Sequence, residues 1–403
     1  MKRKNAALGF IFVTVLVDVM GLGLIIPITP TLIEELIGGT TQQAAGYARW
    51  LTAVYALCQF ICGPILGGLS DKFGRRPVLL IALFGFAVDY LFLAFAPTIG
   101  WLFVARIISG IGGASHTTAS AYIADISSPE NRAKNFGLIG AAFGLGFVIG
   151  PVVGGLLGEM GTRVPFFAAA GLTALNWLYG YFVVPESLPK ENRRNFEWKR
   201  ANPIGTLVHL KNYPVLTGLL IVMVFIFIGQ HATHSTWAFF TEENFGWSPY
   251  EIGLSLGFVG IVIAIVQGAL VGPFVKKMGQ NKAVIVGLSF NAAGLLMMGL
   301  ATQGWMIYAI MLPYALGGLA GPALQGIMTS QVGADAQGEL QGGITSLQSL
   351  TNIVGPLIML SIFYEFTDPE AATYFPGAPF MLGTVLATIS LFIAIKSLRG
   401  KQL

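Results

Sequence analysis

The chain has few charged residues for its length. Only 10% of its 403 residues are charged, whereas 54% are hydrophobic, and soluble domains carry roughly a quarter charged residues. A surface with so little charge cannot lie mostly in water, so most of it is expected to face lipid. The shortage of charge therefore argues against a soluble globular protein and predicts a chain that crosses a membrane many times.

Cysteine and catalytic motifs are also scarce. The two cysteines, Cys58 and Cys62, have no histidine or further cysteine nearby that would complete a metal or redox pattern, and we interpret them as small buried residues. We find no phosphate-binding loop, no nucleophile elbow and no paired carboxylates in an aqueous segment. The sequence therefore predicts neither an enzyme nor a bound cofactor or metal, and it leaves an ion gradient rather than ATP as an energy source.

Apolar stretches of the length that spans a bilayer, about 20 residues, recur between polar breaks. We predict twelve membrane-spanning helices, near residues 8–30, 46–69, 77–97, 99–122, 135–158, 165–184, 213–238, 251–275, 283–302, 304–328, 340–364 and 376–397. The longest internal polar stretch, 185–212, divides them six and six. The expected fold class is an all-α membrane protein with an N-terminal bundle over 1–184, a cytoplasmic linker over 185–212 and a C-terminal bundle over 213–403.

The basic residues predict the orientation of the chain. Of the 23 lysines and arginines, only Arg49 and Arg163 fall on connections of one side and Arg106 lies inside a span, so the other twenty share the opposite side. Cytoplasmic loops carry an excess of Lys and Arg, and both termini are therefore predicted to be cytoplasmic. The net charge of +4 reflects this orientation rather than binding to nucleic acid.

Acidic and basic side chains alternate in the predicted cytoplasmic loops. Asp71, Arg75, Asp125 and Arg132 form opposite-charge pairs that a folded bundle would bring together. Such a cluster can latch one conformation, and its release opens another. The alternative is that these are solvated loop charges that only follow the positive-inside pattern.

Three formal charges fall inside predicted spans, away from the span ends: Asp18, Asp89 and Arg106. A charge at the middle of a bilayer costs about 2.5–3.5 kcal/mol on insertion scales, so we expect all three to face the protein interior. A carboxyl group in a partly dry cavity beside a guanidinium can exchange a proton when substrate or conformation changes its surroundings. The alternative is that Arg106 forms an ion pair with an aspartate that only stabilises the N-terminal bundle.

Two motifs carry a resemblance to a known family. The loop after the second span resembles the major facilitator loop signature at Gly67, Asp71, Gly74, Arg75 and Arg76. The fifth span resembles the antiporter signature of that superfamily at every fixed position, namely Gly137, Gly146, Gly150, Pro151, Gly154 and Gly155. The resemblance implies two six-helix bundles with a substrate path between them, and the second motif points to exporters.

Further similar positions recur in order and spacing over nearly the whole chain, namely Asp18, Pro27, Pro30, Tyr55, Gln59, Asp89, Arg106, Asp125, Arg132, Glu242 and Gln325. With them the resemblance narrows to the tetracycline/proton antiporters. It implies proton coupling through Asp18 and Arg106 and a substrate path that includes Asp89 and Gln59, and we assign Asp89 to proton coupling as well. From the resemblance and the polar cluster of the seventh span together, we assign the substrate contacts to Tyr55, Gln59, Asp89, Gln230, His234, Asn291 and Gln325. His234 has the alternative role of a locally hydrogen-bonded interfacial histidine.

The C-terminal half departs from that group at two positions. Asn291 stands where those antiporters carry an acidic residue, and Ile263 stands where they carry a histidine. Neither side chain can exchange a proton near neutral pH. These departures leave the substrate open between tetracycline-type antibiotics and other compounds.

We therefore expect a proton-coupled exporter of small amphipathic drug-like compounds in the bacterial cytoplasmic membrane. Its expected partners are the small-molecule substrate, protons and the lipid bilayer, with no nucleic acid, and a monomer is the default of the family. Two alternatives stay open: an exporter of one endogenous metabolite, such as a siderophore or a sugar-like molecule, and an uncoupled facilitator.

Overall fold

Helices account for all regular secondary structure in the part of the chain that the computed structural model describes. It describes residues 2–113, 115–128, 131–197, 216–333 and 337–398, without the side chains of 2–7, 115–117, 132–134 and 338–339. The N-terminal helices are α1 (Lys2–Ile25), η1 (Ile26–Ile28), α2 (Thr29–Ile37), α3 (Thr41–Phe73), α4 (Arg75–Phe95), α5 (Ile99–Gly113), α6 (Ser115–Ile126), α7 (Arg132–Gly158), α8 (Val164–Val183) and η2 (Lys190–Asn192).

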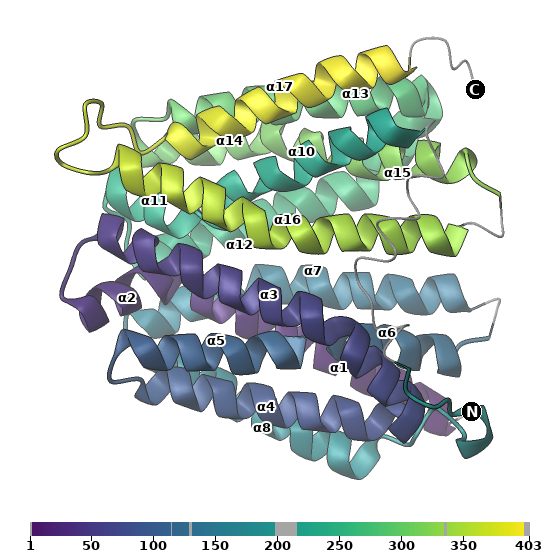
Figure 1. Cartoon of the computed structure of the whole chain (residues 1–403). Coiled ribbons are helices and arrows are strands. Elements are labelled where there is room, and N and C mark those ends of the chain that lie inside the picture. The colour runs from purple at the N-terminus through teal and green to yellow at the C-terminus, as the bar shows by residue number, and fades with distance from the viewer. Residues whose placement is uncertain (1, 114, 129–130, 198–215, 334–336, 399–403) are drawn as a thin grey trace. The chain divides into compact units, whose positions relative to one another are not determined.

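The C-terminal helices follow the same pattern of long apolar rods with local breaks (Figure 1). They are α10 (Thr217–His234), α11 (Trp237–Phe245), α12 (Pro249–Ile265), η5 (Val266–Leu270), α13 (Val271–Gly299), α14 (Gly304–Ala315), η6 (Leu316–Leu319), α15 (Ala320–Ser330), α16 (Gln337–Phe366) and α17 (Ala378–Leu398). Pro27 begins the break between α1 and α2, and Pro313 precedes the break between α14 and α15, because proline lacks the amide donor that a regular helix needs.

Among the residues that the structure describes, ten helical stretches are long and apolar enough to cross a membrane, and they overlap eleven of the twelve predicted spans. One stretch, Pro249–Gly299, is 51 residues long and holds two spans, since Gly279 leaves the helical conformation at φ 80° and ψ 161° and reverses the chain. The one remaining predicted span, 99–122, corresponds to two shorter helices, α5 and α6. They have 15 and 12 residues and lie on either side of residue 114. The chain is a multi-pass membrane protein.

Contacts divide the chain into two compact units. Unit 1 comprises Met1–Gly39, Val54–Pro203 and Ser248–Gly257, and unit 2 comprises Thr40–Ala53, Ile204–Trp247 and Phe258–Leu403. The division cuts through α3 and α12 and lies near the predicted linker, whose residues 198–212 are outside the described ranges. The assignment of 1–184 and 213–403 as domains stays a prediction.

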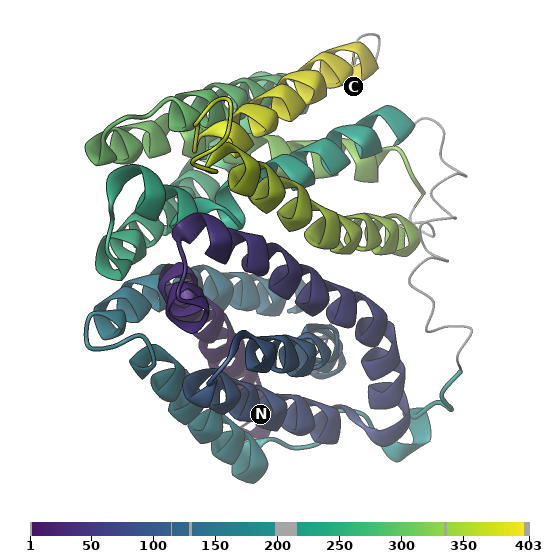
Figure 2. The same ribbon diagram turned by 60° about the vertical axis from the view of Figure 1, so that its left-hand side comes forward.

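Each unit is built around its own apolar core. In unit 1, α1 packs against α7 and α8, and α4 packs against α5 and α8. In unit 2, α17, the yellow helix in Figure 2, packs against α10 and α13. The buried side chains of the unit 1 core include Phe10, Ile11, Val15, Leu79, Leu83, Tyr122 and Ile123. Large apolar side chains remain exposed on the outside, for example Phe182 at 79% and Phe392 at 67%, as expected for surfaces that face lipid.

The first turns of α3 are held in unit 2 by polar contacts with α16. Arg49 Nη1 donates to Ser361 Oγ at 3.0 Å, and its guanidinium lies 5.0 Å from the centre of the Tyr364 ring. Gln42 donates to the carbonyl of Tyr364 and to Asp368 Oδ2, both at 3.2 Å. These bonds explain why residues 40–53 are grouped with the second unit rather than with the remainder of α3.

Candidate functional site

The buried charges of unit 1 meet between α4 and α5. Asp89 is 1% exposed, and its Oδ2 lies 3.6 Å from Arg106 Nη2. The Arg106 guanidinium also lies 5.9 Å from the centre of the Tyr55 ring of α3, within the range of a cation–π interaction. The second oxygen of Asp89, Oδ1, is buried and has no hydrogen-bond partner among the described residues, so this carboxylate retains an unused acceptor.

Asp18 belongs to the same electrostatic group. Its side chain on α1 is 8% exposed, and Oδ1 is buried without a hydrogen-bond partner in the described part of the chain. The hydroxyls of Tyr55 and Tyr90 interact electrostatically with Asp18, Asp89 and Arg106. Unit 1 therefore gathers two carboxyl groups, one guanidinium and two phenols in its interior.

Glycine lets these side chains approach the neighbouring helices closely. A Cβ at Gly21 of α1 would overlap the Tyr90 hydroxyl, and a Cβ at Gly113 of α5 would lie 2.8 Å from the Tyr55 hydroxyl. Gln59 Nε2 donates to the Gly113 carbonyl at 3.3 Å and to the Tyr55 hydroxyl at 3.5 Å. The predicted substrate residues Tyr55 and Gln59 thus lie beside the buried charges.

The described polar groups around Asn291 in unit 2 are neutral. The Tyr314 hydroxyl of α14 lies 3.4 Å from Thr233 Oγ1 of α10, and the same hydroxyl hydrogen-bonds with the Asn291 side chain of α13. Asn291 packs closely against Gly317, because a Cβ added at Gly317 would lie 3.0 Å from the Cβ of Asn291. Tyr314 therefore joins α10, α13 and α14 through uncharged hydrogen bonds, and Asn291 is one of its two partners.

The other predicted substrate residues of unit 2 are spread over different places. The His234 ring lies 6.2 Å from that of His231, which hydrogen-bonds with Asn352 of α16 and occupies the space beside Gly355. The carbonyl of Gln230 accepts from Thr233 Oγ1 at 2.8 Å. The side chain of Gln325 is exposed and donates to Gln341 Oε1 at 3.0 Å, so it joins a polar pair with α16 rather than the cluster at Asn291.

Within the described residues, no group of three or more His, Cys, Asp or Glu side chains is arranged to hold a metal ion. The carboxylates of Asp18 and Asp89 are instead surrounded by phenol, guanidinium and amide groups. Such surroundings can exchange a proton and can hydrogen-bond or stack with an organic molecule.

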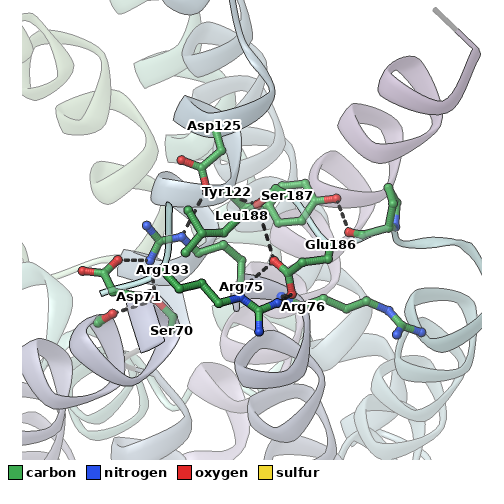
Figure 3. A network of polar contacts seen from close by, with 12 residues as sticks. Ser70, Asp71, Arg75, Arg76, Tyr122, Asp125, Glu186, Ser187, Leu188 and Arg193 are labelled. Carbon is green, nitrogen blue, oxygen red and sulfur yellow. Dashed lines mark hydrogen bonds and ion pairs between the residues drawn. The ribbon is translucent and has the colours of Figure 1, made fainter. Parts of the chain in front are cut away.

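The predicted cytoplasmic loop forms a polar network around Arg75 (Figure 3). Arg75 Nη1 lies 2.5 Å from Asp71 Oδ1 and donates to Ser70 Oγ at 2.6 Å, and Arg75 Nε lies 3.2 Å from Asp125 Oδ2. Ser70 in turn donates to the Gly67 carbonyl at 2.7 Å. The structure thus brings Gly67, Asp71, Arg75 and Asp125 together.

The remaining predicted gate residues lie at the edges of this network. Arg76 Nη2 donates to the Tyr181 carbonyl at 2.6 Å, and the Arg76 guanidinium lies over the Tyr181 ring of α8. Gly74 adopts φ 105°, a conformation that favours glycine. Arg132 begins α7, and its side chain is outside what the structure describes.

Sequence reasoning missed Glu186, which lies in the segment that we predicted to be only a linker. Its Oε1 accepts from the Arg75 amide at 2.8 Å, and its Oε2 accepts from the Arg76 amide at 3.3 Å. The next residue, Ser187, donates its hydroxyl to Asp125 Oδ2 at 3.1 Å. A helix that starts directly after a glycine leaves its first amides without partners, and this was the one sequence signal that an acceptor was needed there.

The motif of α7 acts as a packing surface. Added Cβ atoms at Gly146, Gly150 and Gly154 would lie 2.9 Å or less from backbone atoms of α1, and one at Gly155 would lie 2.5 Å from the Pro249 carbonyl of α12. The Pro151 carbonyl similarly occupies the space beside Gly253. Gly137 is different, because an added Cβ there would meet nothing within 4 Å. Five of the six motif positions therefore lie in close helix contacts.

The sequence matches the pattern that defines the Major Facilitator Superfamily over residues 11–356 and again over 241–396. The chain belongs to this superfamily. The twelve-helix fold that the resemblance implied is thereby confirmed, and the superfamily consists of membrane transporters rather than enzymes.

Several curated relatives of this major facilitator are resistance proteins. It is 40% identical to the class C tetracycline resistance protein of Escherichia coli over 96% of both chains, and 35% identical to the class B protein of Escherichia coli over 99% of both chains. The resemblance to the tetracycline group is thereby confirmed.

Solved transporters share the fold at low sequence identity. The human organic anion transporter MFSD10 has a TM-score of 0.70 and 22% identity, covering 97% of this chain and 99% of that one. A mutant of the nucleoside transporter NupG has a TM-score of 0.78 and 12% identity, with the same coverage. These likenesses support the architecture and carry no information on the substrate.

Proposed function

We propose that the protein exports small amphipathic drug-like compounds, including tetracycline-type antibiotics, in exchange for protons. The observation that carries the proposal is the pair of buried aspartates, Asp18 and Asp89, with the half-buried Arg106 beside Asp89, in a chain that is 40% identical to a tetracycline resistance protein. Buried charges within a membrane are costly and are retained mainly where they bind or relay ions and substrates.

In this mechanism the proton binds to the carboxyl groups of unit 1. Asp18 has a buried acceptor oxygen without a partner, and protonation would give that oxygen a neutral form suited to its surroundings. Arg106 pairs with Asp89, so it can favour the charged form of the carboxyl group while the two are close and release it when the distance between them increases. If proton and substrate exchange at this site, the inward movement of the proton is coupled to the outward movement of the substrate.

The substrate contacts are assigned to polar groups beside aromatic rings. In unit 1 these are Tyr55 and Gln59, which lie next to the Asp89–Arg106 pair. In unit 2 we assign Gln230, His234 and Asn291, with Gln325 as a more remote contact because it pairs with Gln341. Few polar groups among apolar walls suit a site that accepts varied ligands.

The network around Arg75 is proposed to be a cytoplasmic gate. Asp71 and Ser70 of α3 and Asp125 of α6 all bind the guanidinium of Arg75 in α4. A movement that separates α4 from α6 must therefore break the bond to Asp125, and one that also separates α4 from α3 must break the bonds to Asp71 and Ser70. The excess of basic loop residues supports a cytoplasmic position for this end and for both termini, and we propose that the membrane is the inner membrane of a bacterium.

The test is transport into inverted membrane vesicles that carry an inside-acidic pH gradient. Tetracycline with Mg²⁺ and the cationic dye ethidium are measured in parallel, with and without a protonophore. We expect uptake of at least one compound that collapses with the gradient. Uptake that is indifferent to the gradient would indicate an uncoupled facilitator, and uptake of neither compound would favour an exporter of a single metabolite.

A further inference from the structure

The segment that follows α8 lies across the start of α4 and binds the gate at several points. Glu186 accepts from the amides of Arg75 and Arg76, which are the first two residues of α4, and also from the Leu188 amide at 3.0 Å. Further along, the Arg194 amide donates to the Asp71 carbonyl at 3.1 Å. Residues 186–194 thus contact both ends of the loop that links α3 to α4.

Glu186 is placed where a negative charge stabilises the helix most. The first amides of an α-helix have no partner inside the helix and carry the positive end of its dipole. A carboxylate that accepts from two of them satisfies both donors and opposes that charge. Arg193 adds a guanidinium 3.9 Å from Glu186 Oε2, so the carboxylate is held from a second side.

Gly74 makes this contact possible. A side chain at residue 74 would run into the Glu186 carboxylate, and the φ of 105° is one that L residues rarely adopt. Because Gly74 has no side chain, the carboxylate can reach the first turn of α4. Gly74 and Glu186 are therefore complementary, although 111 positions separate Glu186 from Arg75 in sequence.

We propose that Glu186 is a positioning residue of the cytoplasmic gate: by holding the first turn of α4, it fixes the direction in which Arg75 presents its guanidinium to Asp71 and Asp125. Ser187 contributes by donating to Asp125 Oδ2, the oxygen that also accepts from Arg75 Nε. The inference rests on the proposed function for its consequence in transport, but the placement of the helix start can be tested without any substrate.

The first experiment is hydrogen exchange in the purified full-length protein, followed in peptides that cover residues 73–80. Glu186→Ala should speed exchange at the Arg75 and Arg76 amides about tenfold, while Glu186→Gln, which keeps the shape, should speed it less. The matched controls are Glu191→Ala and Glu191→Gln, since Glu191 is an exposed acid of the same segment. Unchanged exchange in both Glu186 variants would overturn the inference.

The second experiment separates positioning from a purely structural role. For a compound that the wild type transports, Glu186→Gln should lower the maximal rate about tenfold and leave KM within about twofold, because the gate does not contact substrate. If Glu186 acts through Arg75 and Asp125, the effects of Glu186→Gln and Asp125→Asn on the rate should not add.

Additive effects, or a change confined to KM, would overturn the positioning role. If the wild type transports neither tetracycline with Mg²⁺ nor ethidium, the proposed function fails by itself. Hydrogen exchange would then still decide whether Glu186 holds the first turn of α4.

Discussion

The two units make the same sharp turn at one end but surround it with different chemistry. Gly74 in unit 1 has φ 105° and ψ 158°, and Gly279 in unit 2 has φ 80° and ψ 161°. A Cβ at Gly74 would meet Glu186 and Arg193, whereas one at Gly279 would meet nothing within 4 Å. Unit 2 also has Lys276 where unit 1 has Asp71. The two units therefore share the backbone turn at this glycine, while the polar network around Arg75 belongs to unit 1.

The same contrast holds inside the membrane-spanning helices. Unit 1 buries Asp18 and Asp89 with Arg106 nearby, while the hydrogen bonds of unit 2 around Tyr314 join Asn291 and Thr233 without a charge. Among the described residues, the buried aspartates Asp18 and Asp89 lie in unit 1, and buried charge is costly in hydrocarbon, so we infer a division of labour between the units. The proton chemistry that we propose is therefore assigned to unit 1.

The largest effect is expected from Asp18→Asn, which removes a titratable group from unit 1 and keeps its size. Gradient-driven export should fall by at least about 100-fold, as is typical when a proton-transferring group is lost. Asp368→Asn is the matched control, an aspartate of unit 2 outside the spans, and should retain export within about twofold. Wild-type export by Asp18→Asn would disprove the coupling role, and its aggregation would point to a structural one.

A smaller effect should distinguish the two glycine turns. Alanine at either position must adopt a backbone conformation that is nearly exclusive to glycine and costs about 1–3 kcal/mol. Gly74→Ala should cost more than Gly279→Ala, because its methyl group would also displace the Glu186 carboxylate. The melting temperatures of the two purified variants test this order. Equal losses would mean that Glu186 moves aside freely.

Asn291→Asp would weaken the contrast between the units by adding a carboxyl group to unit 2. The new group would lie beside Tyr314 and Gly317, at the position where the resembling antiporters carry an acid. We expect a severalfold gain in uptake of tetracycline with Mg²⁺ into energised vesicles, since a second titratable group would be present. Gln325→Glu, which adds an acid outside the Asn291 cluster, is the control and should not give the gain. Equal gains in both variants would show that charge alone, and not its place, matters.

Composition and local spacing predicted the membrane-crossing helices, since eleven of the twelve predicted spans overlap long apolar helices among the described residues. Because a charge inside a span is costly, Asp18, Asp89 and Arg106 could be predicted to face the protein interior, and the structure brings all three together inside unit 1. Asp71, Arg75 and Asp125 could be paired in advance because opposite charges in neighbouring loops attract. These predictions depended on residue type and on contacts that a helical bundle makes obligatory.

The contacts of Glu186 and Gln325 depend on the tertiary path of the chain and could not be predicted this way. Glu186 lies in a polar stretch that looks like any linker, and only the return of that stretch to α4 gives the carboxylate its two amide partners. Gln325 was assigned to the substrate path by resemblance, but it pairs with Gln341 because α15 and α16 bring the two amides together. Such contacts leave no periodic pattern in the sequence.

The smallest effect is expected when the phenols of the two units are compared. Tyr314→Phe removes a hydroxyl that is shared with Thr233 and Asn291, and a neutral hydrogen bond contributes about 1 kcal/mol, so KM should rise by no more than about fivefold. Tyr55→Phe keeps the ring beside Arg106 but removes a hydroxyl that interacts with both buried carboxylates. It should therefore also alter the pH dependence of export, whereas Tyr314→Phe should not. An altered pH profile in Tyr314→Phe alone would mean that the proton is bound in unit 2, and the division of labour between the units would have to be reversed.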